Sequence, residues 1–519
     1  DNREVCVETA ASHPKRRVTK GAMRGTCNLL FAGGVNTITS YYGYTDLTDE
    51  ALRRLNEGVG RRAYLLAGGH QVADVALVYP VESIWVRFTP SRVWVNDASA
   101  AAQIEHLCKS AAESLFAARR DFTFVDSRAL VDAAVEPGAL VHGPLRWRVI
   151  VLPGVDTLPM AAWEKLEHFV RNGGAVIALG HLPANSEREF PAPGVARLAR
   201  AIFGPNSTAP RVHTHAAGGA GIYLPPGTEA MLPLVLDGLL GPDVKVDDPR
   251  APLRVTHRRV EGREVYLLIN DSPRPWTGAV RFAAARGERW DPGTGRGHEL
   301  ASATTPRDAA TTGDEVSLAL EPYGAALFRF AEARLPRRHP IAAGTLPNLT
   351  FQGVRSVEPT MAHGEFVRGE LTPDPARLDA GSPTWRAVGT LTRSQVDTFL
   401  FLQFRFEPPL DLSAADCLEV ETAVPTGQST ASRILVILSE DGGGDFIADT
   451  GRALAQPDRQ PALIPWNRFQ HAGWSQDADG SLDLSRVRDI RVGWGGYLGH
   501  EGEQDRKSTR LNSSHGKLS

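Results

Sequence analysis

Glu8 is a carboxylate in an unusual sequence setting. It ends the stretch VCVE, whose apolar and β-branched residues predict a strand. A charged carboxylate at the end of such a strand is costly to bury unless it has a chemical task or a charged partner. Two interpretations stay open: a group that takes part in chemistry at a strand end, or an ion pair with Arg3, Lys15 or Arg16.

Six aromatic residues could contact a ligand. Tyrosine and tryptophan rings stack on flat apolar faces and also donate hydrogen bonds. One group follows the predicted strand VNTITS and the other lies near the C-terminus: Tyr41, Tyr42 and Tyr44, and then Trp474, Trp494 and Tyr497. The alternative role is packing, between domains for the first group and inside a core for Trp494.

Metal-ligand patterns are weak. The cysteines lie far apart and form no CxxC motif, which argues against structural zinc and a disulfide scaffold (Cys6, Cys27, Cys108 and Cys417). The loop DADGSLD at 477–483 carries Asp at alternating positions, as Ca²⁺ loops do, but no bidentate Glu follows it. We therefore expect no cofactor, with a structural Ca²⁺ in the C-terminal domain as the alternative.

The elements that must position Glu8 lie within residues 1–72. A helix is predicted over 20–32, because apolar residues recur on one face. A second helix, capped by Asp49, runs to Gly68-Gly69. Strand, helix, strand and helix at this spacing fit the last two units of a (β/α)8 barrel. Two units cannot close a barrel, so we expect the preceding strands upstream and the chain to be a C-terminal fragment.

Residues 73–225 alternate between apolar strands and amphipathic helices. VADVALVYP, RVIVLPG and AVIALG read as strands buried on both faces, and helices are predicted over 100–119 and 160–171. This alternation predicts a doubly wound, flavodoxin-like α/β domain. The phosphate fingerprint G-x-G-x-x-G is absent from its strand-to-helix turns, so a dinucleotide is not expected.

The remainder is predicted to be all-β. Hairpin turns at VEGRE and DPGTG indicate a small antiparallel β-sandwich over 250–332. A Pro-rich linker follows over 333–344, and alternating strands indicate a jelly-roll β-sandwich over 345–500. DRKSTRLNSSH resembles the translation of a sequencing-library adapter, as found at the ends of assembled metagenomic genes. We therefore expect 505–519 to be a non-native or disordered tail that does not pack.

The length and charge of the chain limit the number of domains and the kinds of partner that we expect. At 519 residues, about three to four domains are expected. The net charge of −3 and pI of about 6.6 leave no basic footprint for nucleic acid. No apolar run approaches the ~20 residues of a membrane span. Neither nucleic acid nor a membrane is an expected partner.

Three stretches resemble large multidomain glycoside hydrolases. They are VCVET…GGVNTITSYYGY, HQVADVALVYP…RWRVIVLPGVDTLP…FVRNGGAVIALG and EVYLLINDSPRPWTG…ERWDPGTGR…LALEPYG. The resemblance is to hydrolases with a (β/α)8 catalytic barrel followed by a trimerisation- or amidotransferase-like α/β domain. Some β-galactosidases and the α-L-rhamnosidase-like hydrolases are of this type. The jelly roll resembles a carbohydrate-binding module through ALIPWNRF and LDLSRVRDIRVGWGG.

The resemblance implies roles for the residues above. In these families the nucleophile sits at the end of strand seven, which is the position that Glu8 matches. The partner acid/base then comes from an earlier strand, because glycosidases use two carboxylates. The three tyrosines would contact the sugar, and the three C-terminal aromatic residues would form the sugar platform of the module.

The expected function is hydrolysis of O-glycosyl bonds in poly- or oligosaccharides, by a chain that is incomplete and inactive alone. A secreted or periplasmic location and a homo-oligomer through the α/β domain are expected with it. The alternative is a non-catalytic carbohydrate-binding or scaffolding protein. The sugar, the linkage and the stereochemical outcome stay open.

Overall fold

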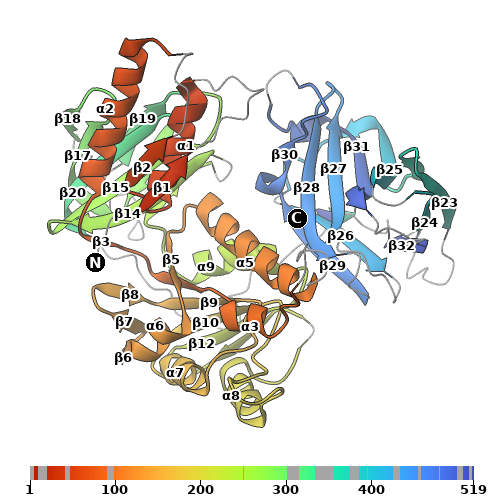
Figure 1. Cartoon of the computed structure of the whole chain (residues 1–519), viewed down its shortest axis with the longest axis horizontal. Helices are drawn as coiled ribbons and strands as arrows, with labels where there is room; N and C mark the ends of the chain where they lie inside the picture. Colours follow the sequence, from red (N-terminus) through yellow and green to blue (C-terminus); the bar gives the residue numbers. More distant parts are fainter. Residues whose placement is uncertain are drawn as a thin grey trace.

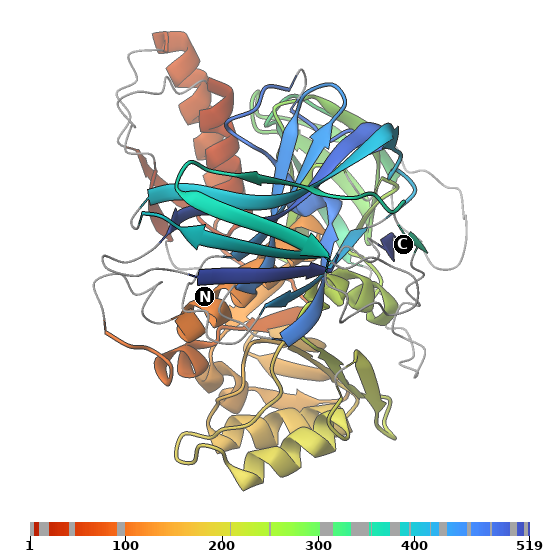
Figure 2. The ribbon, with the colours of Figure 1, turned by 90° about the vertical axis from the view of Figure 1, so that its right-hand side faces the viewer.

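The structure is a computed structural model of the 519-residue chain. It describes residues 5–9, 20–40, 47–90, 99–207, 209–248, 251–300, 315–333, 352–353, 355–373, 385–393, 396–415, 417–424, 433–453, 458–477, 480–498, 506–512 and 517–518. Figure 1 shows a helix pair with a β-sandwich at the upper left, an α/β domain below them and a second β-sandwich on the right. Figure 2, turned by 90°, places the second sandwich in front of the other parts.

A two-stranded parallel sheet and two helices make up the first part of the chain. The strands are β1 (Cys6–Thr9) and β2 (Thr37–Ser40), and the helices are α1 (Lys20–Ala32) and α2 (Asp49–Leu66). The order strand, helix, strand, helix is the one predicted. These elements do not by themselves form a barrel, so the barrel stays a prediction.

The start of α2 differs from the prediction that Asp49 caps it. The N-cap is Thr48, whose Oγ1 accepts a hydrogen bond from the Ala51 amide at 3.2 Å. Asp49 and Glu50 occupy the first turn instead, where their negative charge interacts favourably with the helix dipole. A threonine and an aspartate side by side both satisfy the sequence pattern, so the pattern alone leaves the position ambiguous by one residue.

A six-stranded sheet forms the centre of the α/β domain. The strands are β4 (Val75–Val78), β5 (Phe122–Val125), β9 (Val149–Pro153), β10 (Ala175–Leu179), β11 (Arg211–Thr214) and β12 (Ala220–Leu224). Their order is β5-β4-β9-β10-β12-β11, and every pair is parallel except β11 with β12. Numbered along the chain, the parallel strands lie in the order 2-1-3-4-5, which is the flavodoxin-like arrangement.

Helices cover both faces of this sheet. They are α3 (Val81–Trp85), α5 (Ser99–Ala117), α6 (Ser127–Asp132), α7 (Met160–Arg171), α8 (Pro193–Phe203) and α9 (Leu232–Leu239). Trp163 of α7 packs with Ile150 in one core, while Leu115 of α5 and Leu236 of α9 pack with Val151 in the other. Every residue of β9, β10 and β12 is consequently buried, as in parallel sheets covered on both sides. A small antiparallel sheet that was not predicted lies beside them: β6 (Ala134–Glu136), β7 (Ala139–His142) and β8 (Leu145–Trp147).

The next part is an antiparallel β-sandwich. One sheet has the order β18-β17-β20-β15-β14-β3 and the other has the order β13-β16-β19. The strands are β3 (His70–Gln71), β13 (Val244–Val246), β14 (Leu253–Val260), β15 (Arg263–Asn270), β16 (Trp276–Phe282), β17 (Ala284–Asp291), β18 (Arg296–Glu299), β19 (Glu315–Leu320) and β20 (Ala325–Ala333). Tyr266, Phe282 and Phe328 lie in the core between the sheets. The edge strand β3 comes from the segment between α2 and the α/β domain, so the sandwich recruits residues from outside its predicted range.

The C-terminal part is a second β-sandwich. Its strands are β21 (Gln352–Gly353), β22 (Thr360–His363), β23 (Val367–Pro373), β24 (Trp385–Leu391), β25 (Val396–Leu410), β26 (Cys417–Val424), β27 (Arg433–Glu440), β28 (Asp445–Ala453), β29 (Asp458–Pro465), β30 (Gln470–His471), β31 (Val487–Leu498), β32 (Arg506–Asn512) and β33 (Lys517–Leu518). One sheet has the order β22-β25-β31-β27-β28-β30, and the other contains β23, β24, β26, β29 and the C-terminal strands. Trp385, Phe446, Trp466 and Trp494 lie in the core between them.

The C-terminal tail differs from the prediction that it does not pack. Arg506–Asn512 form β32, which pairs with β24 on one side and with β26 on the other. The physical reason is that β24 and β26 would otherwise face each other with unpaired backbone N–H and C=O groups, which a strand between them satisfies. In the described part of the chain, no helix combines the length and apolar character needed to cross a membrane.

Candidate functional site

Glu8 lies near the carboxyl end of β1. In the parallel pair it stands opposite Thr39 of β2, so the residues that follow the two strands leave from the same edge. Tyr41, Tyr42 and Tyr44 come next in the chain after β2, but they lie outside the described residues, as does the side chain of Glu8. Functional groups of (β/α)8 enzymes gather at this end of the strands. The structure places the backbone of Glu8 within β1, and the catalytic role of Glu8 and the roles of the tyrosines stay predictions.

Side-chain contacts fix the register of the strand pair. The Val5 amide donates a hydrogen bond to Asn36 Oδ1 at 2.9 Å, and Cys6 Sγ lies 3.5 Å from Thr39 Oγ1. A slip of one residue would turn every side chain of a strand to the opposite face. These contacts consequently hold Glu8 at its position opposite Thr39.

The helices attach the strand pair to the first β-sandwich. Phe31 of α1 and Leu66 of α2 are buried in one apolar cluster with Leu267 and Leu327 of the sandwich. Because α1 and α2 each follow one of the two strands, this packing positions the strand pair as well. Glu8 is thus placed by elements from two parts of the molecule.

A second candidate site lies on the C-terminal sandwich around Trp474. The indole is 64% exposed, and its Nε1 donates a hydrogen bond to Asp445 Oδ2 at 3.1 Å. Arg491 Nη2 and Ser439 Oγ donate to Asp445 Oδ1 at 3.0 and 2.6 Å. The arrangement joins an exposed ring to a guanidinium and a carboxylate, which are the components of a surface that stacks on a sugar ring and hydrogen-bonds its hydroxyls.

The Asp445 carboxylate is held in its charged form. Burial by itself raises its pKa, but hydrogen bonds from Ser439 and Trp474 and the charge of Arg491 outweigh burial, so the pKa lies below the ordinary value. An ionised carboxylate accepts hydrogen bonds only. The Trp474 ring is therefore held in place by a fixed acceptor.

The other two aromatic residues predicted for the sugar platform do not join Trp474. Trp494 is 0% exposed and lies in the core, so the prediction that it contacts a sugar is wrong for this residue. The reason is strand alternation, because Trp494 stands opposite Leu400, which is also a core residue. Tyr497 of β31 stands opposite Asp397 of β25, and the side chain of Tyr497 lies outside the described residues.

In the acidic loop considered for Ca²⁺, the first and last carboxylates accept hydrogen bonds from nearby backbone amides. Asp477 accepts a hydrogen bond from the Gly480 amide, and Asp483 Oδ1 accepts one from the Ser485 amide at 2.9 Å. Among the described residues, no group of three or more His, Cys, Asp or Glu side chains is arranged to hold a metal ion.

A buried polar cluster escaped the sequence analysis. His257 is 4% exposed, and its Nδ1 and Nε2 lie 2.9 Å from Asp243 Oδ2 and 2.8 Å from Glu264 Oε2. Burial lowers the pKa of His257, but the two carboxylates overcome this effect and raise the pKa to about 9. The predicted VEGRE hairpin could have indicated Glu264, since it brings β14 and β15 together. Asp243 precedes β13, and no sequence pattern around it indicated that it belongs to this cluster.

A sequence profile described as the α-L-rhamnosidases of glycoside hydrolase family 106 matches residues 35–304, just over half of the chain. The chain belongs to this family. The predicted resemblance to multidomain glycoside hydrolases is thereby confirmed. The matched range contains β2, α2, the α/β domain and most of the first sandwich, while Glu8 and Trp474 lie outside it.

Solved structures with similarity to the chain include a rhamnosidase from Novosphingobium sp. PP1Y, with 17% identity over 97% of this chain and 45% of that one, at a TM-score of 0.44. A β-galactosidase from Bacillus circulans sp. alkalophilus has 13% identity over 60% of this chain and 52% of that one, at a TM-score of 0.39. A family 11 carbohydrate-binding module from Clostridium thermocellum has 12% identity over 33% of this chain and 95% of that one, at a TM-score of 0.24.

The chain spans about half the length of the rhamnosidase and of the β-galactosidase. No curated protein sequence matches the chain.

Proposed function

We propose that the chain contributes Glu8 and a sugar-binding module to the hydrolysis of α-L-rhamnosyl bonds in poly- or oligosaccharides. The observation that carries this proposal is the family match over 35–304, which includes the β2–α2 unit beside Glu8. The bond cleaved is the one in the description of the family. The proposal covers the activity of the whole hydrolase, to which this chain supplies one part.

Glu8 is assigned the role of one of the two catalytic carboxylates. Glycosidases place a pair of carboxyl groups on the two sides of the scissile bond, about 5–5.5 Å apart in retaining enzymes and about 6.5–9.5 Å apart in inverting ones. The partner is assigned to another barrel strand, as the sequence analysis expects. Since acid and base act as a pair, we expect no turnover by the chain alone.

Trp474 is assigned to sugar binding on the C-terminal sandwich. Its exposure and its fixed orientation by Asp445 support this role. The same observation supports the second candidate, a non-catalytic carbohydrate-binding or scaffolding protein, because binding at Trp474 needs no catalytic barrel.

Self-association through the α/β domain and a secreted or periplasmic location remain part of the proposal. Exposed apolar side chains support the first: Tyr79, Trp85 and Phe88 follow the carboxyl end of β4, and Phe124 lies on the neighbouring strand β5. The rings of Tyr79 and Phe124 are in edge contact, with centroids 6.2 Å apart. Analytical ultracentrifugation of the chain and a Trp85→Ser variant tests this association.

The proposed activity is tested with an aryl α-L-rhamnoside and an aryl β-D-galactoside. Two proteins are compared: the chain itself, and the chain extended at its N-terminus by the six preceding barrel strands of a family member. We expect cleavage of the rhamnoside by the extended protein only, and oligosaccharide binding by both in calorimetry. Preferential cleavage of the galactoside would contradict the assigned bond. Binding without cleavage in either protein would favour the second candidate.

A further inference from the structure

A strongly cationic pocket lies between the helix pair and the first β-sandwich. It has a volume of about 430 Å³ and lies between α1, α2, the β17–β18 turn and the β19–β20 turn. Five cationic side chains and two carboxylates line it: Lys20, Arg24, Arg54, Arg62 and Arg289, with Asp291 and Glu321. The balance is positive although the whole chain carries a net charge of −3. A ligand in this pocket would experience a concentrated positive field.

Arg62 is the unusual member of this pocket. It is 4% exposed, and its side chain makes no hydrogen bond or ion pair with any residue in the described part of the chain. Its Nε is buried without a partner, and its guanidinium lies over the Phe31 ring, 5.7 Å from the centroid. Burial lowers the pKa of Arg62 to about 10, which leaves it charged near neutral pH. A buried charge without a partner is costly, so an anionic partner would be strongly favoured here.

The guanidinium of Arg62 faces the space that the pocket provides. Its Nη2 and Nη1 lie 3.6 and 3.7 Å from the point where a Cβ on Gly58 would stand, and Gly58 also lines the pocket. Arg289 on β17 lines it from the opposite side, and within the described residues its side chain also has no hydrogen bond or ion pair. Two arginines from separate elements thus line the same pocket, and the Asp291 carboxylate acts on Arg62 through its charge alone, without an ion pair.

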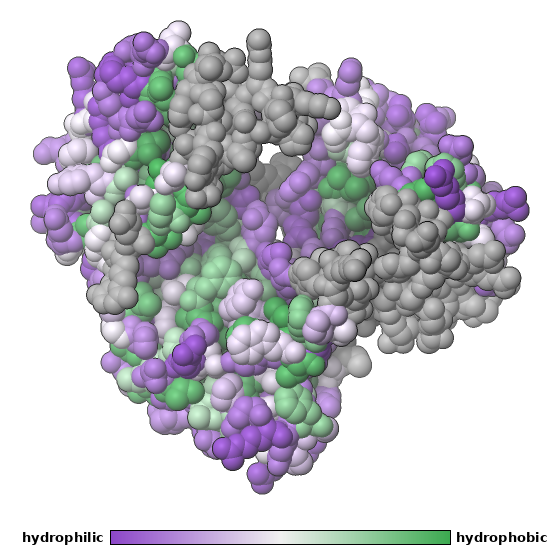
Figure 3. All heavy atoms as spheres, viewed as in Figure 1, coloured by the Kyte–Doolittle hydropathy of each residue, from purple (hydrophilic) through white to green (hydrophobic). Residues whose placement is uncertain are grey.

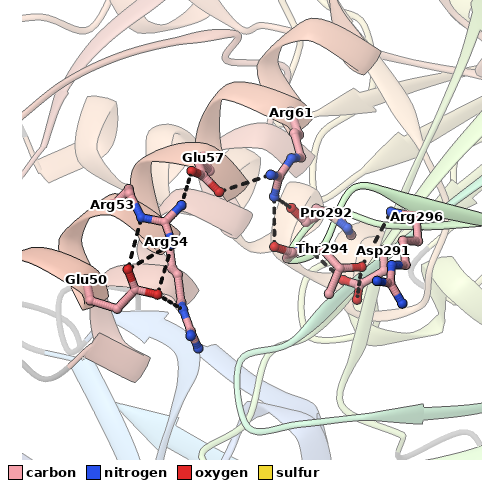
Figure 4. A network of polar contacts seen from close by, with 10 residues as sticks. Glu50, Arg53, Arg54, Glu57, Arg61, Asp291, Pro292, Thr294 and Arg296 are labelled. Atoms are coloured by element: carbon pink, nitrogen blue, oxygen red, sulfur yellow. Dashed lines mark hydrogen bonds and ion pairs between the residues drawn. The ribbon is translucent and has the colours of Figure 1, made fainter.

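The two carboxylates in the pocket are committed to other partners. Asp291 Oδ1 accepts a hydrogen bond from the Gly293 amide at 2.8 Å, and its Oδ2 accepts one from Thr294 Oγ1 at 2.9 Å. Glu321 is exposed and pairs with Arg24 at 2.9 Å. Figure 4 shows Asp291 and Thr294 directed at each other within the turn. Within the described residues, neither carboxylate forms an ion pair with Arg62 or Arg289.

Other arginines of α2 form ion pairs with glutamates of the same helix. Arg53 is held by Glu50 and Glu57, and Arg61 by Glu57 and by the carbonyl of Gly293 at 2.8 Å (Figure 4). Hydrophilic side chains gather at the upper left of Figure 3, where α2 lies in Figure 1. Arg62, one position after Arg61, points to the other side of the helix and lacks such a carboxylate.

The start of α1 adds to the positive potential. α1 has 13 residues, begins at Lys20 and has no acidic residue in its first turn. The first turn of a helix carries partial positive charge and free backbone amides, which favours anions. The pocket therefore combines a helix start, two unpaired guanidinium groups and a cavity open enough for a small ligand.

We propose that this pocket binds a small oxyanion, either the carboxylate of an acidic sugar or a free phosphate-like anion, with Arg62 and Arg289 as its principal ligands. Planar guanidinium groups match the paired oxygens of carboxylates and phosphates. The proposal is independent of the assignment of Glu8, because binding here is measured without glycoside cleavage.

Calorimetric titration of the full chain at low ionic strength tests the proposal. The probes are sodium D-glucuronate, with D-glucose as its neutral control, and sodium phosphate, with sodium chloride at matched ionic strength. We expect at least one oxyanion to bind and to raise the thermal midpoint, while glucose and chloride do neither. Tighter binding of glucuronate than of phosphate would assign the site to an acidic sugar, and the reverse order would assign it to a free anion.

Three variants make the test specific. We expect Arg62→Met and Arg289→Ala each to weaken oxyanion binding at least tenfold. Arg53→Ala serves as the matched control, because Arg53 is exposed on the same helix and does not line the pocket. Should Arg62→Met fail to fold, Arg289→Ala decides the outcome. Absence of oxyanion binding in the unaltered chain, or equal binding by Arg289→Ala, would overturn the proposal.

Discussion

Two sheets with parallel strands in this molecule are built in opposite ways. In the six-stranded sheet, β9, β10 and β12 are buried at every residue, and helices cover both faces. In the β1–β2 pair, Cys6 is exposed, and Val5, directly before β1, is 47% exposed. Side chains of the large sheet are therefore expected to matter mainly for stability, whereas the strand pair that carries Glu8 is more exposed, as the proposed role of Glu8 requires.

The largest expected contrast is between the effects of the same substitution, valine to aspartate, in the two sheets. Val151→Asp places a carboxylate in an apolar core, among neighbours that offer it no partner, and should cost more than about 4 kcal/mol. Val7→Asp in β1 should cost about 1 kcal/mol or less, because Val7 is only partly buried. Urea unfolding followed by circular dichroism measures both. Equal losses would show that the two sheets contribute alike to stability.

A similar contrast separates two tryptophans of the C-terminal sandwich. Trp494→Ala removes a fully buried ring and should cost about 3–5 kcal/mol. Trp474→Ala should change stability by about 0.5 kcal/mol or less, but abolish oligosaccharide binding. Thermal unfolding and calorimetry on the two variants check this pair. Unchanged sugar binding by Trp474→Ala would contradict the assignment of Trp474 to sugar binding.

The His257 cluster predicts a pH dependence of stability. The folded pKa of about 9 lies above the ordinary value of 6.5, so the protonated form stabilises the fold. The stabilisation is complete below about pH 6.5 and is lost as the pH rises through 9, with a total of about 3 kcal/mol. Urea unfolding between pH 7 and 9.5 measures the loss. His257→Gln, which cannot be protonated, should be less stable at pH 7 and show a flatter profile.

The periodic spacing of apolar residues made much of the fold predictable. Apolar strands alternate along the chain with helices whose buried faces carry Ile104 and Trp163. This alternation predicts the flavodoxin-like arrangement, because each strand and helix can be recognised from the local spacing of its apolar residues. Trp494 was ambiguous, since the glycines around it in RVGWGG hide the alternation that decides which face is buried. Asp243 and Arg62 could not be interpreted in advance, because their settings depend on elements distant in sequence.

The smallest expected effect concerns α2, which anchors the strand pair. Gly60 lies within the helix and is exposed, and no atom lies within 4 Å of the point where a Cβ on this residue would stand. Gly60→Ala should stabilise the chain by about 0.5–1 kcal/mol through helix propensity alone. A differential scanning calorimetry trace with a higher midpoint would agree, and a lower midpoint would reveal strain at this position.

The most direct test of the account is the rate of aryl α-L-rhamnoside hydrolysis by the N-terminally extended protein and its Glu8→Gln variant. We predict that the variant folds normally and loses kcat/KM by about 10³-fold or more, because glutamine can act neither as nucleophile nor as base. Asp49→Asn, at the exposed start of α2, is the control and should retain full activity. A Glu8→Gln variant with undiminished kcat/KM would contradict the assignment of Glu8 as a catalytic carboxylate.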